Sequence, residues 1–258
     1  MEQLFNTAPV PLMGVLVLAL MLAAAAGGMA LRRVNDRSSG ASATAQSEGL
    51  EGYIVSAVLG LLALLMGFTF ALAVDRFEIR RGLVLQEANA IGTTYLRAQL
   101  LEEPHRTRVS RLLVEYADNR ITLAKTGAAA APQLLAANDR LVTDLWTATV
   151  AAFPTIKHMD FSTAFVEGMN EVIDLDAARK AARQARVPSA VFGVLIIYVV
   201  ATAGVLGYVL GNGRGRLAAG FLLPLVALSL MLVVDIDRPV NGGVREGQGP
   251  MEALRASL

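Results

Sequence analysis

The amino-acid sequence predicts an all-α membrane protein, in which four transmembrane helices form two hairpins that flank a cytoplasmic four-helix domain. Three observations lead to this fold class. Four apolar stretches, near residues 9–31, 53–74, 187–210 and 217–234, each have about the 20 residues that a helix needs to cross a bilayer. None of the four carries a charged residue in its interior. Between the second and third stretches, apolar and polar side chains recur at helical spacing.

These boundaries divide the chain into four parts. They are a first transmembrane hairpin (residues 1–74), a cytoplasmic helical domain (75–186), a second transmembrane hairpin (187–238) and a short C-terminal tail (239–258). The composition agrees, because 54% of the residues are hydrophobic and only 17% are charged, with a mean hydropathy of +0.50. A large soluble protein with buried core helices is the alternative, but it does not account for four uninterrupted stretches of this length.

Charge and residue types exclude several classes of function. The formal net charge of +1 gives no basic field for nucleic acid. The chain has no cysteine, hence no disulfide and no thiolate metal site, and its two histidines, His105 and His158, are far apart. Ser56, Thr69, Thr202 and Ser229 are isolated hydroxyls within the spans, without a nearby histidine or lysine. We therefore expect no cofactor and no enzymatic activity.

The N-terminus differs from a secretory signal peptide. Glu2 is the only charged residue before the first apolar stretch, where a signal peptide carries basic residues. The stretch is also longer than a signal's apolar region, so we expect a retained helix. Cleavage near residues 23–26, an alanine run, is the alternative.

Four crossings place both termini and the middle domain on one side of the membrane, with the loops at 32–51 and 211–216 on the other. Nine basic residues near the span ends are on the domain side: Arg76, Arg80, Arg81, Arg179, Lys180, Arg183, Arg186, Arg238 and Arg245. Five are on the opposite side: Arg32, Arg33, Arg37, Arg214 and Arg216. The positive-inside rule therefore predicts that the middle domain and both termini are cytoplasmic.

The middle domain is predicted to contain four amphipathic helices. The first continues from span two without a break to about residue 101. Its apolar face carries Phe77, Val84, Ala88, Ile91, Tyr95 and Ala98, and Glu78, Arg80, Glu87, Thr94 and Arg97 are expected on other faces. The second helix begins at Pro104, Pro154 stops the third, and Asp160 caps the fourth, which leads towards Pro188.

Small residues recur every four positions in three spans. These stripes are Ala19, Ala23 and Gly27; Ala63, Gly67 and Ala71; and Ala203, Gly207 and Gly211. They allow helices to approach closely in lipid, either within one subunit, between subunits or along a pore.

The cytoplasmic end of span two is rich in aromatic residues. Gly67, Phe70, Val74 and Phe77 lie there near helical spacing, which a ring of copies could turn into a hydrophobic constriction that gates by dewetting. Packing against lipid or protein is the alternative. Charges follow two of the spans: Asp75 and Arg76 after span two, and Asp235, Asp237 and Arg238 after span four. Pairing between these ends is the favoured interpretation, and a hard cation held by the two aspartates is the other.

Three segments resemble the bacterial bestrophin-like family. The long one is GFTFALAVDRFEIRRGLVLQEANAIGTTYLRAQLL (residues 67–101); MNEVIDLDAARKAARQARVP (169–188) and DIDRP (235–239) support it. The resemblance implies kinship with bestrophins, which are pentameric anion channels with a pore lined by the second transmembrane helix and a narrow hydrophobic neck. It places the neck at Phe70. The acidic calcium clasp of animal bestrophins has no counterpart beyond Asp235 and Asp237, so calcium gating is not expected.

Several polar residues inside these segments are candidates for family-specific roles: Asp75, Arg76, Glu87, Asn89, Asn170, Glu171 and Asp174. They either form a buried polar network that fixes how the first and fourth domain helices meet, or line an ion path. With this resemblance, the sequence favours a homo-oligomeric anion channel of the bacterial inner membrane that contacts the lipid bilayer and inorganic ions. The alternative is a non-conducting membrane scaffold whose helical domain binds a partner protein.

Overall fold

The computed structural model describes residues 9–38, 45–126, 131–210, 214–239 and 242–258, and all regular structure in these ranges is helical. Four helical stretches among them are long and apolar enough to cross a membrane. They are Val10–Arg37, Glu51–Ala98, Ser162–Val209 and Gly215–Asp237. The predicted class, an all-α membrane protein with four spans, is confirmed.

The chain divides into two compact units. The first, called the membrane unit here, comprises residues 1–75 and 186–244. It holds α2 (Val10–Ser38), the first part of α3 (Ala45–Ala98), α7 (Ser189–Val209) and α8 (Arg214–Asp237). The second, called the polar unit, comprises residues 76–185 and 245–258. It holds the rest of α3, α4 (His105–Lys125), α5 (Ala131–Ile156), α6 (Ser162–Gln184) and α9 (Gly249–Ser257).

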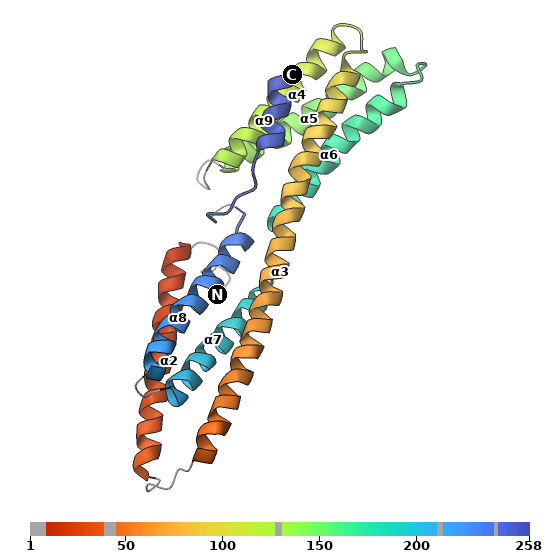
Figure 1. Ribbon diagram of the computed structural model, residues 1–258. Coiled ribbons are helices and arrows are strands. Elements are labelled where there is room, and N and C mark those ends of the chain that lie inside the picture. The colour runs from red at the N-terminus through yellow and green to blue at the C-terminus, as the bar shows by residue number, and fades with distance from the viewer. Residues whose placement is uncertain (1–8, 39–44, 127–130, 211–213, 240–241) are drawn as a thin grey trace. The chain divides into compact units, whose positions relative to one another are not determined.

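In the membrane unit, α2 packs against both α7 and α8, and α7 also packs against α8 (Figure 1). The core side chains are apolar and come from all four helices: Met21, Ala25, Leu62, Leu195, Val199, Ala203, Leu206, Leu223, Ala227 and Leu230. Glycine makes the contact between α2 and α7 close. A methyl group on Gly207 would overlap with the backbone of Ala25, and one on Gly28 would overlap with the carbonyl oxygen of Gly204.

The three small-residue stripes therefore have different surroundings. Gly207 packs within the subunit, whereas Ala19, Ala23 and Gly27 are exposed on α2. Gly67 on α3 has open space around the position of a Cβ atom. Gly211, the last member of the α7 stripe, lies outside the described residues.

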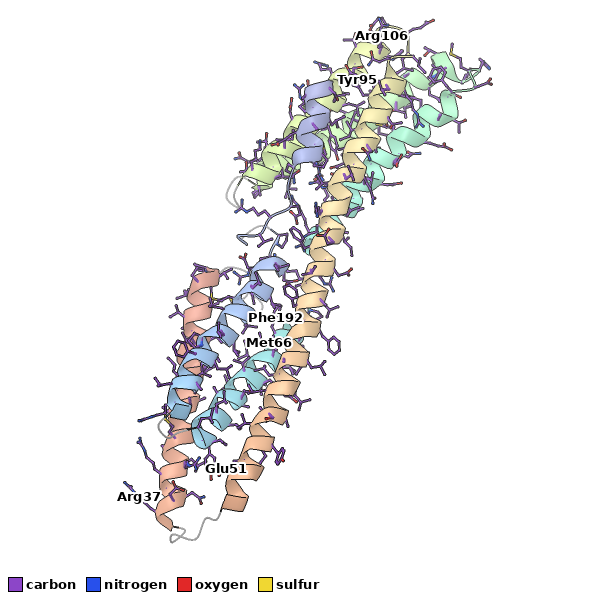
Figure 2. All side chains as sticks on the ribbon, in the orientation of Figure 1. Arg37, Glu51, Met66, Tyr95, Arg106 and Phe192 are labelled. Atoms are coloured by element: carbon purple, nitrogen blue, oxygen red, sulfur yellow. The ribbon has the colours of Figure 1, made fainter. Side chains whose placement is uncertain are left out.

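The helices of the first hairpin are longer than the spans expected from hydropathy. α2 continues to Ser38 and α3 begins at Ala45, so part of the expected loop at 32–51 is helical. Arg37 and Glu51 lie at the same end of this unit, whereas Met66 and Phe192 lie along its length (Figure 2). Arg32 connects α2 to the end of α7, because its Nη1 donates hydrogen bonds to the carbonyl oxygens of Tyr208 (2.9 Å) and Val209 (2.7 Å). These are terminal carbonyls of α7 without a partner in their own helix.

In the polar unit, α4 packs against α5 and α9, and α5 packs against α6 (Figure 1). α3 contributes Ala88, Ala90, Ile91 and Ala98 to a core in which Leu113, Tyr116, Leu145, Phe165 and Met169 are fully buried. The short α9 adds the fully buried Met251. α3 is unbroken from Ala45 to Ala98, as the sequence predicts for span two and the first domain helix.

Two local expectations are wrong. α5 passes through Pro154 to Ile156, because a proline so near the end of a helix removes only one backbone bond. Asp160 does not cap α6, which starts after Phe161 without a side-chain cap. Arg80, Glu87 and Thr94, which the sequence places off the apolar face of α3, are buried as well, because other elements surround this part of α3 on more than one side.

Candidate functional site

The part of α3 in the membrane unit has one packed face and one open face. Leu62 is buried in the core, and Leu59 and Met66 pack beside it. On other sides of the helix the chain leaves large apolar side chains uncovered: Leu61, Leu64, Phe68, Phe70 and Leu72. Phe68 is 62% exposed and Phe70 is 40% exposed. An exposed aromatic surface on a membrane helix needs lipid or another protein surface to cover it.

A groove of 530 Å³ lies between α3 and α8 in this unit. Gly67 and Phe70 line it from α3, and Leu225, Ser229 and Leu232 are among the residues that line it from α8. The Ser229 hydroxyl already donates to the carbonyl oxygen of Leu225 at 2.9 Å. The groove is thus apolar in character and suits apolar side chains or acyl chains.

The four predicted neck residues differ in how far the rest of the chain covers them. Gly67 and Phe70 are exposed and line the groove, whereas Val74 and Phe77 are only partly exposed. Phe68, which is not among the predicted neck residues, is more exposed than Phe70. Exposure of this kind cannot be read from the sequence, since apolar residues cover every side of a membrane helix.

The two aspartates after span four, Asp235 and Asp237, accept hydrogen bonds from backbone N–H groups. The carboxylate of Asp235 accepts hydrogen bonds from the backbone N–H groups of Gly243 (2.7 Å) and Val244 (3.1 Å). Asp237 accepts one from Val187 at 3.0 Å, just before α7. Arg238 is buried in the same region, and Asp75 is exposed at the end of the span-two segment. Among the described residues, no three His, Cys, Asp or Glu side chains cluster as metal ligands would.

A buried polar network lies at the centre of the polar unit, around Glu87 of α3. Tyr116 Oη donates to Glu87 Oε1 at 2.6 Å. Arg120 Nε lies 3.1 Å from the same oxygen, and Arg179 Nη1 binds the other carboxylate oxygen. The Arg120 guanidinium also lies 5.8 Å from the centroid of the Tyr116 ring, within range of a cation–π contact. Glu87 thus joins α3 to α4 and α6.

Asp176 of α6 is the second acidic residue of the network. Its Oδ1 accepts from Asn138 Nδ2 of α5 at 2.8 Å and pairs with Arg120 Nη1 at 3.2 Å. Its Oδ2 pairs at 2.6 Å with Lys180, which also binds Asp139 at 2.6 Å. Two buried carboxylates therefore meet two buried arginines, and a partly exposed Lys180–Asp139 pair lies at the edge. Four helices meet with their charges balanced, which limits the desolvation cost of burial.

Protonation in the network follows from this geometry. Burial, reinforced by the negative charge of Glu87, raises the pKa of Tyr116 well above its ordinary value, so the phenol stays neutral and donates its proton. Burial is the largest single effect on the pKa of Arg120 and lowers it, but Glu87, Tyr116 and Asp176 together outweigh burial, so the pKa is raised. The network is therefore a set of hydrogen-bond donors and acceptors in which Tyr116 and Arg120 keep their protons.

Comparison with known proteins identifies the architecture. A family model of the bestrophin-like domain matches residues 19–245 of this chain. The chain belongs to the bestrophin-like family. No curated protein matches it.

Solved structures of bacterial bestrophin homologues from Klebsiella pneumoniae share the bestrophin-like fold of this chain. One, a single-residue variant, aligns with a TM-score of 0.63 at 16% identity and covers 97% of this chain and 95% of its own. Another, solved by Zn-SAD phasing, aligns with a TM-score of 0.61 at 17% identity and covers 95% and 93%. At this level of identity the likeness concerns the fold.

The polar residues of the bestrophin-like segments fall into two groups in the structure. Glu87 is fully buried in the network. Asn89 on α3 and Asn170, Glu171 and Asp174 on α6 are exposed and lie outside it. Sequence reasoning missed Tyr116, Arg120, Asn138, Asp176 and Arg179. A signal existed, since Asp176, Arg179, Lys180 and Arg183 recur at spacings of three and four on one face of α6.

Proposed function

We propose that this protein forms an anion channel in the bacterial inner membrane, as a homo-oligomer whose pore is lined by α3. Membership of the bestrophin-like family supports the oligomeric channel. Resemblance to bestrophins favours a pentamer. The proposal assigns the protein no enzymatic activity, no cofactor and no resident metal.

The observation that carries this proposal is the uncovered apolar face of α3 in the membrane unit. Phe68 and Phe70 stand exposed there, and the space around Gly67 is open. If several copies bring their α3 helices around an axis, these side chains narrow the passage and exclude water when it closes. We place the hydrophobic neck at Phe70, with Gly67, Val74 and Phe77 as neighbours along the same helix.

The excess of basic residues near the polar unit supports an orientation with that unit and both termini in the cytoplasm.

Anion flux into liposomes tests the neck. We expect Phe70→Ala to raise the flux several-fold, because a methyl group in place of a ring widens and wets the constriction. Phe68→Ala is the internal comparison and shows which aromatic residue forms the neck. Phe221 on α8 is 75% exposed and lies outside the proposed pore, so Phe221→Ala serves as the matched control. Unchanged flux in Phe70→Ala, with a conducting wild type, would remove the neck assignment.

A non-conducting scaffold is the second candidate function. The exposed positions of Asn89, Asn170, Glu171 and Asp174 favour it, because polar side chains in family segments stay on the surface and outside the network. In that case crosslinking in native membranes recovers a stoichiometric partner protein, whereas a channel yields contacts between its own copies.

A further inference from the structure

A small cavity in the polar unit is distinct from the surfaces discussed so far. Arg80 and Val84 of α3, Arg179 and Arg183 of α6, and Glu246 from the segment before α9 line it. Its volume is ≈ 10 Å³, about the room of one water-sized sphere. Arg80 and Arg179 are 3% and 4% exposed, so the cavity is set into the interior of the unit.

The charges around the cavity do not balance. Arg80 Nε pairs with Glu246 Oε1 at 2.6 Å, and Arg179 pairs with Glu87. Arg183 is the third guanidinium in the lining, and Glu246 is the one carboxylate among the described residues that line the cavity. Three guanidinium groups thus meet two carboxylates, which leaves an excess of one positive charge.

We propose that this cavity binds a single monatomic inorganic anion, with chloride as the physiological species. Guanidinium N–H groups only donate hydrogen bonds, so a guest that only accepts them suits a lining with three such groups. The excess positive charge favours an anion over water, and the small volume excludes phosphate or a carboxylate ligand. The bound anion holds α3, α6 and the segment before α9 together.

Chloride dependence of thermal unfolding tests the site. The full-length protein is purified in detergent and unfolded at constant ionic strength while chloride replaces gluconate. A ligand that binds only the folded state stabilises it in proportion to the logarithm of its concentration above Kd. We expect the unfolding midpoint to rise by about 3 °C per tenfold increase in chloride in that range. Chloride NMR line width provides the direct binding readout.

Two variants remove the site by different means. Arg183→Gln removes the excess charge at a partly exposed position, and Val84→Leu fills the cavity while every charge stays in place. Both should lose the chloride dependence and the line broadening. Arg81→Gln is the matched control, because that arginine is also on α3 but its side chain is 65% exposed.

Each outcome decides the proposal. Loss of the chloride dependence in both variants, with the control unchanged, supports it. Equal midpoints in chloride and gluconate, or a dependence that persists in both variants, overturns it and means that the cavity holds water only. Phe70→Ala should keep the chloride dependence, so failure of the proposed pore and failure of this site are separate results.

Discussion

Glu87 has no exposed surface, and its burial is made tolerable by donors from Tyr116, Arg120 and Arg179. A buried carboxylate without partners would be costly, and loss of one charged partner would leave another charge uncompensated. The sequence alone suggested Glu87 as a family-specific residue but not its partners, because charged residues at helical spacing usually belong to a solvated surface. Only the packing of α4, α5 and α6 around α3 shows that these charged residues are buried partners of Glu87.

Tyr116→Phe measures how much one hydrogen bond to Glu87 contributes to the free energy of unfolding. The variant loses a 2.6 Å bond to a charged acceptor, and we expect the free energy of unfolding to fall by about 1.5–3 kcal/mol. Tyr95→Phe is the comparison, since its partly exposed hydroxyl donates to an oxygen of Leu258 at the longer distance of 3.3 Å. That change should cost about 1 kcal/mol or less. Equal losses would mean that the burial and the shorter length of the Tyr116–Glu87 bond add nothing to it.

Tyr116→Phe should also change how the free energy of unfolding depends on pH. The folded state raises the pKa of Tyr116 above the unfolded value of about 10. The contribution of the protonated Tyr116 to the free energy of unfolding is therefore fully present below pH about 10. This contribution is lost as the pH rises further towards the pKa of the folded state. The wild type should lose stability above this pH more steeply than Tyr116→Phe. Parallel pH profiles would contradict the assignment of Tyr116 as the titrating group.

At the scale of helices, the contact between α2 and α7 depends on where glycine lies. Gly207→Ala places a methyl group against the backbone of Ala25, which cannot move aside as a side chain can. We expect it to lower stability in detergent by about 1–3 kcal/mol. Gly204→Ala is the matched control on the same helix, because its methyl group would lie 3.7 Å from the carbonyl oxygen of Ala24, an ordinary contact. Equal effects would show that helix propensity, and not the close approach, decides stability.

Helices also show which features the sequence could predict. The continuity of α3 from Ala45 to Ala98 follows from an apolar run that leads into an amphipathic one without proline. The end of α5 did not follow, because Pro154 interrupts only the last turn of a helix that Ile156 anchors in the core. The stripe containing Gly207 was visible, but its partner residues on α2 were not, since the spacing of small residues does not say which face meets which helix.

At the scale of the whole molecule, the family and the four spans followed from the sequence, whereas the number of copies is not encoded in any local pattern. The chain by itself leaves a large part of the apolar surface of α3 and α8 open, including Phe68 and Phe221. Lipid can cover such a surface, and so can neighbouring subunits. The proposed pore requires neighbouring subunits, because one α3 helix cannot enclose a passage.

Native mass spectrometry in a mild detergent and in nanodiscs therefore tests the proposed assembly. We expect a pentamer in both media, because the resemblance to bestrophins implies five pore-lining helices around one axis. A pentamer in nanodiscs that dissociates in detergent would still allow the pore and would show that lipid strengthens the contacts. A monomer or dimer in both media would leave no axis for α3 to surround. The exposed polar residues of α3 and α6 would then be a docking surface, as the scaffold function requires.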